Sequence, residues 1–186
     1  MRTFLHKALL FGKLLILMYI LSFFSLALFK CFHIELPHTT KEDDAWLLSI
    51  IEGRSFQFLA LLSLAIGMVE EFLFRIIPFL LLHLLFVYRE NARKSYARLH
   101  AYMLIISSAL FGYLHVMSWK GIFIQGTSGA ILYLALLLFG AHKLHEKKSQ
   151  SQFAILASSY FITALLHGCF DFGVFYLFKM SMPDLK

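Results

Sequence analysis

Long apolar runs separated by short polar segments dominate the sequence. Five of these runs approach or exceed the roughly 20 helical residues needed to cross about 30 Å of hydrocarbon. They are residues 8–29, 55–88, 101–117, 121–141 and 153–178. The pattern predicts an all-α, polytopic membrane helix bundle with about five to six transmembrane helices. We expect residues 1–186 to form a single integral-membrane domain.

The stretch 55–88 leaves the number of crossings open. A helix over its whole length would be about 50 Å long, which is long for one span but short for two. If it crosses once, the N-terminus and the basic segments 88–100 and 142–152 lie on the same side of the membrane. That arrangement fits the tendency of basic loops to share one side. We therefore favour one long, tilted helix, kinked near Pro78.

Composition supports a membrane protein and excludes other classes. The chain is 60% hydrophobic and 15% charged, whereas soluble domains are about half apolar and a quarter charged. The net charge of +6 comes from short basic groups between apolar runs, so we expect a lipid bilayer and no nucleic acid as partner. Two cysteines are too few for a disulfide scaffold. The first run is too long for a signal-peptide core, so we expect a retained helix.

Six ionisable residues interrupt the apolar runs at similar depths. They are Glu70, Glu71, Arg75, His115, His167 and Asp171. In the favoured topology each of them lies about 20–27 Å from the same membrane face, at 1.5 Å per helical residue. A charge in hydrocarbon costs at least about 2.5–3.5 kcal/mol. We therefore expect three helices to turn these groups inward, toward one another.

The spacing of these residues indicates local pairs. Glu71 and Arg75 are four apart, so their side chains can form an ion pair on one helix. His167 and Asp171 are also four apart and share a helix face. Glu70 projects about 100° away from Glu71 and has no partner on its own helix, which suits a general base or acid. The alternative is a buried polar network that only holds the bundle together.

Three short motifs resemble those of a known family. "EEFLFR" at 70–75, "FGYLH" at 111–115 and "HGCFD" at 167–171 are similar to the EExxxR, FxxxH and HxxxN motifs of the CPBP intramembrane proteases. That family includes the CAAX prenyl endopeptidases and bacteriocin-processing relatives. The motifs follow the family's order, and the resemblance covers residues 55–178 as a CPBP-like catalytic core. One departure is Asp171, where the family has asparagine.

The resemblance implies an intramembrane endopeptidase that cleaves a membrane-associated or C-terminally tagged substrate. All six ionisable residues would then belong to the catalytic site. Glu70 and His115 would activate a water, while His167 with Asp171 would stabilise the tetrahedral oxyanion. Arg75 would hold the second glutamate in place. An ionised aspartate accepts but cannot donate a hydrogen bond, so Asp171 favours orienting His167 or binding a metal.

The cofactor, substrate and cellular location are less constrained. Zn²⁺ is one option, with Glu70, His115, His167 and Asp171 as ligands and room for a water. The chain lacks HExxH, and we slightly favour a metal-free water activated by glutamate. We expect a membrane-protein or peptide substrate, such as a lipoprotein-like or C-terminally tagged precursor or a peptide bacteriocin. The expected location is a multi-pass protein of the bacterial inner membrane.

Other functions fit parts of the sequence. A non-enzymatic immunity or scaffold protein of the same family would keep the polar cluster for structure alone. A proton relay would also use intramembrane carboxylates and histidines. "GTSG" at 126–129 fits the GxSG motif of rhomboid serine proteases, with Ser128 as nucleophile and His167 as base. We favour instead a packing role for Gly126, Ser128 and Gly129.

Overall fold

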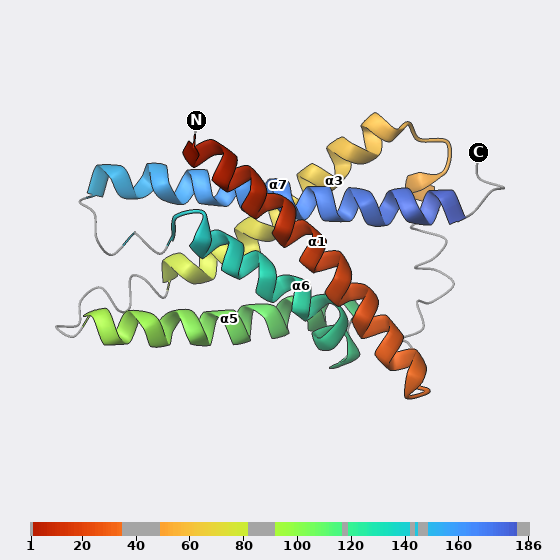
Figure 1. The fold of residues 1–186 in the computed structure, drawn as a ribbon, viewed down its shortest axis with the longest axis horizontal. Coiled ribbons are helices and arrows are strands. Elements are labelled where there is room, and N and C mark those ends of the chain that lie inside the picture. Colours follow the sequence, from red (N-terminus) through yellow and green to blue (C-terminus); the bar gives the residue numbers. More distant parts are fainter. Residues whose placement is uncertain are drawn as a thin grey trace.

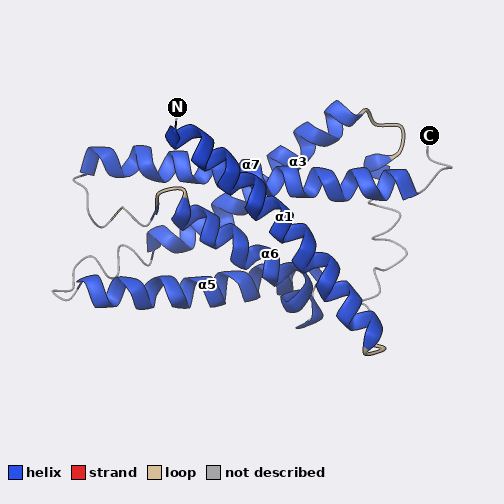
Figure 2. Cartoon of the chain, in the orientation of Figure 1, coloured by secondary structure: helices blue, strands red, loops and turns tan. Residues whose placement is uncertain are grey.

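The computed structural model describes residues 2–34, 49–81, 92–116, 119–141, 144 and 149–181. Within these ranges the regular structure is helical throughout, without strands (Figure 2), which confirms the all-α prediction. The elements are α1 (Arg2–Cys31), α3 (Phe56–Glu71), the π-helix η1 (Phe72–Ile76), α5 (Ala92–Val116), α6 (Trp119–Leu138) and α7 (Ser149–Ser181). Residues 77–81 continue the helix that begins at α3.

Three helices of the described chain are long and apolar enough to cross a membrane. They are Phe4–Cys31, Trp119–Leu138 and Gln152–Leu177, and they match the first, fourth and fifth predicted spans. Helix α5 begins at Ala92, well before the predicted start at residue 101. The end of the second predicted stretch, residues 82–88, lies outside the described residues.

The helices form two packed pairs that α1 crosses. α3 packs on α7 and α5 packs on α6, while α1 contacts both α6 and α7. Figure 1 shows α7 and α5 along opposite edges of the bundle, with α6 between them and α1 running diagonally in front. Helices that are distant in sequence, such as α3 and α7 or α1 and α6, therefore pack against each other.

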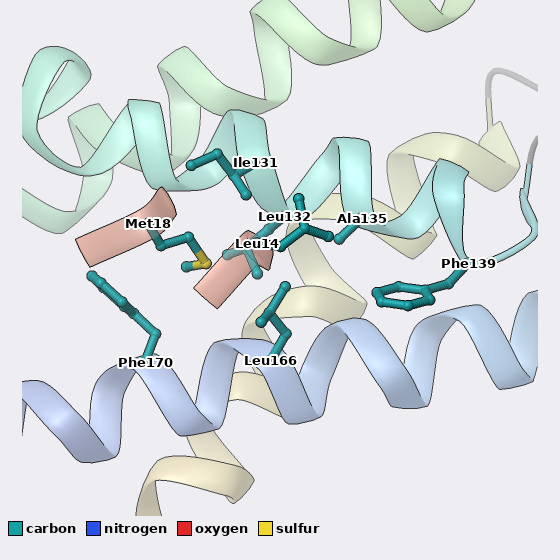
Figure 3. Packing of buried hydrophobic residues seen from close by; sticks show 8 residues of the cluster. All are labelled: Leu14, Met18, Ile131, Leu132, Ala135, Phe139, Leu166 and Phe170. Carbon is teal, nitrogen blue, oxygen red and sulfur yellow. The ribbon is translucent and has the colours of Figure 1, made fainter. Parts of the chain in front are cut away.

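Buried apolar side chains of α1, α6 and α7 pack together in one cluster (Figure 3). Its buried members are Leu14, Met18, Ile131, Leu132, Ala135, Phe139, Leu166 and Phe170. On other faces of α1, large apolar side chains such as Ile16, Ile20 and Phe24 are exposed. Soluble monomers rarely expose apolar patches of this extent, so these faces are suited to lipid.

Glycines set a very close crossing between α3 and α7. A Cβ added to Gly168 would lie 2.8 Å from Leu64 Cα, and one added to Gly67 would lie 2.8 Å from Gly168 N. No other residue type fits such backbone proximity without a shift. Gly67 lies one turn before Glu71, and Gly168 follows His167 directly, so this crossing sets two candidate site residues side by side.

A second close crossing joins α5 and α6. A Cβ on Gly126 would lie 2.9 Å from Ser108 O, and one on Gly129 would lie 3.4 Å from Ser108 Cα. Gly112 faces the α6 backbone at Gly121 just as closely. The packing role predicted for Gly126 and Gly129 is therefore confirmed.

The irregular turn in the second predicted stretch lies just before Pro78, near which a kink was predicted. Ile77 N–H donates to Phe72 O, five residues back, in the π-helix Phe72–Ile76. Proline has no N–H to donate, and its ring crowds the carbonyl four residues earlier, here that of Phe74. The wider turn lies just before Pro78 and directly after the two glutamates. Single π turns of this kind are frequent at functional sites.

We predict that Gly168→Ala destabilises the protein by about 1–3 kcal/mol, the usual cost of overpacking. The added methyl group would meet the backbone of α3, which cannot move aside as a side chain can. Thermal unfolding in detergent, followed by circular dichroism, measures the change. Gly12→Ala is the matched control because nothing lies within 4 Å of its Cβ position. Equal stability of the two variants would contradict the close crossing.

Candidate functional site

A fully buried ion pair forms the base of the site. Arg75 Nη1 lies 3.0 Å from Glu71 Oε1, and the two side chains are 0% and 1% exposed. This confirms the pair that the four-residue spacing predicted. Arg75 Nη2 also donates to Gly129 O at 3.4 Å, and the guanidinium lies 4.2 Å from the centre of the Phe111 ring. One arginine therefore contacts its own helix, α6 and α5.

His167 brings α7 into the same group. Its Nδ1 lies 2.9 Å from Glu71 Oε1, and its Nε2 lies 3.4 Å from Glu70 Oε2 and 3.5 Å from Asp171 Oδ2. The last contact confirms that His167 and Asp171 share a face. Carboxylates stand at both ring nitrogens, and both can donate only in the imidazolium form.

The sequence predicted Arg75 as a partner of Glu71, but it did not predict the contact between Glu71 and His167. Spacing along a chain relates residues of one helix, and these two lie on different helices. The nearest signal is the pair of glycines beside them, Gly67 and Gly168, because these permit the close crossing.

Glu70 and His115 form the second part of the site. Glu70 Oε2 lies 3.2 Å from His115 Nε2, so its partners come from α5 and α7 and not from its own helix, as expected. His115 Nδ1 lies 2.8 Å from Phe111 O. A carbonyl only accepts, so Nδ1 carries a proton and Nε2 is the nitrogen left to exchange one with Glu70.

The six predicted site residues thus form one connected group with a closed and an open side. The closed side, which we call the floor, consists of Glu71, Arg75 and His167. The open side, the rim, consists of Glu70, His115 and Asp171. Floor side chains are 0–3% exposed, whereas rim side chains are 22%, 26% and 21% exposed. The three rim side chains are therefore the members of the group that are open to the surroundings.

A shallow, open depression lies on the surface of α3 beside the rim. It has a volume of about 330 Å³ and is lined by Ala65, Ile66, Val69 and Glu70. Three of these four residues are apolar, and they occupy two successive turns of the helix. The surface next to the Glu70 carboxylate is therefore mainly apolar.

The zinc option, with Glu70, His115, His167 and Asp171 as ligands, stays a prediction. Within the ranges described, no group of three or more His, Cys, Asp and Glu side chains is positioned to hold a metal ion. Glu70 Oε2 lies 3.2 and 3.4 Å from the Nε2 atoms of His115 and His167, and these contacts are ion pairs when the imidazoles are protonated.

Ser128, the alternative nucleophile, has a different partner from the one predicted. Its hydroxyl lies 3.1 Å from Ser22 Oγ on α1, and it is 1% exposed. His167 directs both of its nitrogens toward carboxylates. The geometry does not support a Ser128–His167 dyad.

Comparisons of the chain with protein-family models, with curated proteins and with solved structures give no match. The link to the CPBP family therefore depends on the three motifs quoted above.

We predict that Arg75→Met lowers the free energy of unfolding by about 3–5 kcal/mol, the typical cost of removing one partner of a buried ion pair. Denaturation in detergent measures it. The double variant Glu71→Gln/Arg75→Met should recover part of this loss, since the unpaired charge is gone. Lys13→Met, which removes an exposed cation on α1, is the control and should change little. A fully additive double variant would show that the pair is not coupled.

Proposed function

We propose that the protein is an intramembrane endopeptidase of the CPBP type, which hydrolyses a peptide bond with a water activated by Glu70 and His115. The observation that supports this best is the contact of Glu70 Oε2 with His115 Nε2 at 3.2 Å on the open rim. Beside it, the buried His167 is held by its contact with Glu71, and its Nε2 lies 3.4 Å from Glu70 Oε2. A general base and a fixed donor thereby lie next to each other, as addition to a carbonyl requires.

The chemistry follows from these positions. A water bound at the rim loses a proton to Glu70 as its oxygen attacks the scissile carbonyl carbon. His115 shares that proton through Nε2. The resulting oxyanion is stabilised by the Nε2–H of His167. When the intermediate collapses, the C–N bond breaks, and the proton taken from water passes to the leaving amine. The products are one new carboxyl and one new amino terminus.

His167 is suited to the oxyanion because its other nitrogen is fixed. Nδ1 is committed to Glu71 at 2.9 Å, and Arg75 holds that glutamate in turn. Asp171 cannot replace the family's asparagine as a donor while it is ionised. Its Oδ2 lies 3.5 Å from His167 Nε2, so we assign it to orienting His167 in the resting site.

The proposed setting is the inner membrane of a bacterium, with five to six spans and a catalytic core over residues 55–178. Three helices with spanning length and apolarity support a membrane protein. The open depression on α3 has three apolar lining residues next to Glu70, which supports an apolar segment as the substrate. We therefore propose a membrane-protein or peptide substrate that presents an extended apolar stretch.

The main alternative is a non-enzymatic immunity or scaffold protein of the same family. The floor supports it, since Arg75 and Glu71 join several helices and such a network stabilises a bundle by itself. The rim supports the enzyme, because a purely structural pair has no need to lie 22–26% exposed. A rhomboid-like protease using Ser128 and His167 is less well supported by their separate contacts.

We predict that Glu70→Gln and His115→Ala each reduce cleavage by at least about 100-fold, the scale of general acid–base catalysis. N-terminomics of membrane proteins from cells expressing wild type or variant identifies the products. Glu52→Gln is the matched control, because it neutralises an exposed glutamate outside the site. Identical peptides from the wild type and both site variants would favour the scaffold protein.

We also predict that a strong chelator leaves cleavage by the purified enzyme unchanged, since the proposed mechanism activates the water with Glu70 and His115 alone. A cleavage assay with and without chelator, using a peptide that spans an identified cleavage site, checks this. Loss of cleavage that added Zn²⁺ restores would show that the enzyme depends on a metal.

A further inference from the structure

The phenylalanine of "FGYLH" takes no part in the steps above, although its ring lies among the residues that do. We propose that Phe111 is a positioning residue, which holds the His115 ring with Nε2 directed at Glu70. The proposal rests on the proposed function for its catalytic consequence, but its structural content can be tested separately.

The Phe111 ring contacts three site residues at once. Its centroid lies 4.0 Å from that of His115 and 5.6 Å from that of His167 in an edge-on arrangement. The guanidinium of Arg75 lies over its face at 4.2 Å. The ring is 1% exposed, so packing fixes its own position.

Phe111 constrains His115 from two directions. Its carbonyl receives Nδ1–H at 2.8 Å, and its ring packs against the imidazole at a 45° tilt, with the ring centroids 4.0 Å apart. His115 is the most exposed of the six site residues, at 26%, so other protein groups cover it least. A half-turn of the imidazole about the Cβ–Cγ bond would exchange Nδ1 with Cδ2 and Nε2 with Cε1. Nδ1 would then lose the Phe111 carbonyl, and a carbon would take the place of the nitrogen that faces Glu70.

The ring is itself held in place by its neighbours. Phe74 meets it edge-on with a centroid distance of 5.6 Å. A Cβ added to Gly129 would lie 3.0 Å from Phe111 Cδ1 and 3.2 Å from Arg75 Nη2. Because Gly129 has no side chain, the Phe111 ring and the Arg75 guanidinium can both pack next to it.

Phe111→Leu tests the proposal in the full-length protein, because it keeps an apolar side chain but removes the flat ring. With a peptide spanning an identified cleavage site, we expect kcat to fall about 10- to 100-fold, the scale of a misplaced catalytic group. We expect KM to stay within about twofold. Phe79→Leu is the matched control, since Phe79 is also 1% exposed and stacks on another α5 histidine, His100, at 5.8 Å.

A second readout does not depend on cleavage. Nitrogen-15 NMR of histidine-labelled protein in lipid nanodiscs reports which ring nitrogen carries the proton. His115→Gln identifies the His115 signal by its loss. At a pH where the ring is neutral, we expect wild type and Phe111→Leu to differ: a single tautomer protonated at Nδ1 in wild type, and a mixture of tautomers in the variant.

Gly129→Ala supplies a variant in which Phe111 itself is retained. The added Cβ presses on the Phe111 ring. We therefore expect kcat and the tautomer of His115 to change in the same direction as in Phe111→Leu, but by a smaller amount. Gly12→Ala is its control, with open space at the Cβ position. This variant keeps the proposal testable if Phe111→Leu fails to fold.

The outcomes separate the two proposals. If wild type cleaves, but Phe111→Leu matches Phe79→Leu in kcat and keeps one tautomer, the positioning role is overturned and the protease is not. If wild type yields no products, yet the tautomer changes as expected, the positioning role is supported and the protease is contradicted.

Discussion

The burial of the Arg75 guanidinium is the constraint on which the rest of the site depends. A buried charge left without partners is strongly destabilising, and this one is 0% exposed. Its partners come from several helices: a carboxylate on α3, a carbonyl on α6 and an aromatic face on α5. The carboxylate, that of Glu71, in turn meets His167 on α7. The contacts of one cation and its carboxylate partner therefore link four helices.

These contacts are possible only because the backbones approach closely. In lipid, apolar side chains give helices little reason to associate, so close packing of small residues takes over. Gly67 with Gly168 brings α3 onto α7, and Gly126 with Gly129 brings α6 onto α5. Each crossing lies within about a turn of a site residue. The glycine crossings thus set the distances between polar side chains on different helices.

The six site residues are unequally exposed, and this difference supports the proposed function. The floor is enclosed by protein, whereas the rim opens to its surroundings. A network built only for stability gains nothing from open members, because partial solvation weakens its electrostatics. A hydrolytic site needs both parts: a rigid base that fixes a donor, and reachable groups that exchange protons with water.

The sequence by itself determined the all-α class, the apolar runs of the three helices that are long enough to cross a membrane, and the pairs four residues apart, such as Glu71 with Arg75. These follow from the 3.6-residue period, which relates positions within one helix. It also indicated that Gly126 and Gly129 serve helix packing. Only the tertiary structure decided that His167 reaches Glu71, that Phe111 lies among the site residues and that the irregular turn precedes Pro78. Contacts between helices depend on crossing points and on the rotation of each helix about its axis. Neither is encoded in local spacing, because both are settled by how all the helices pack together.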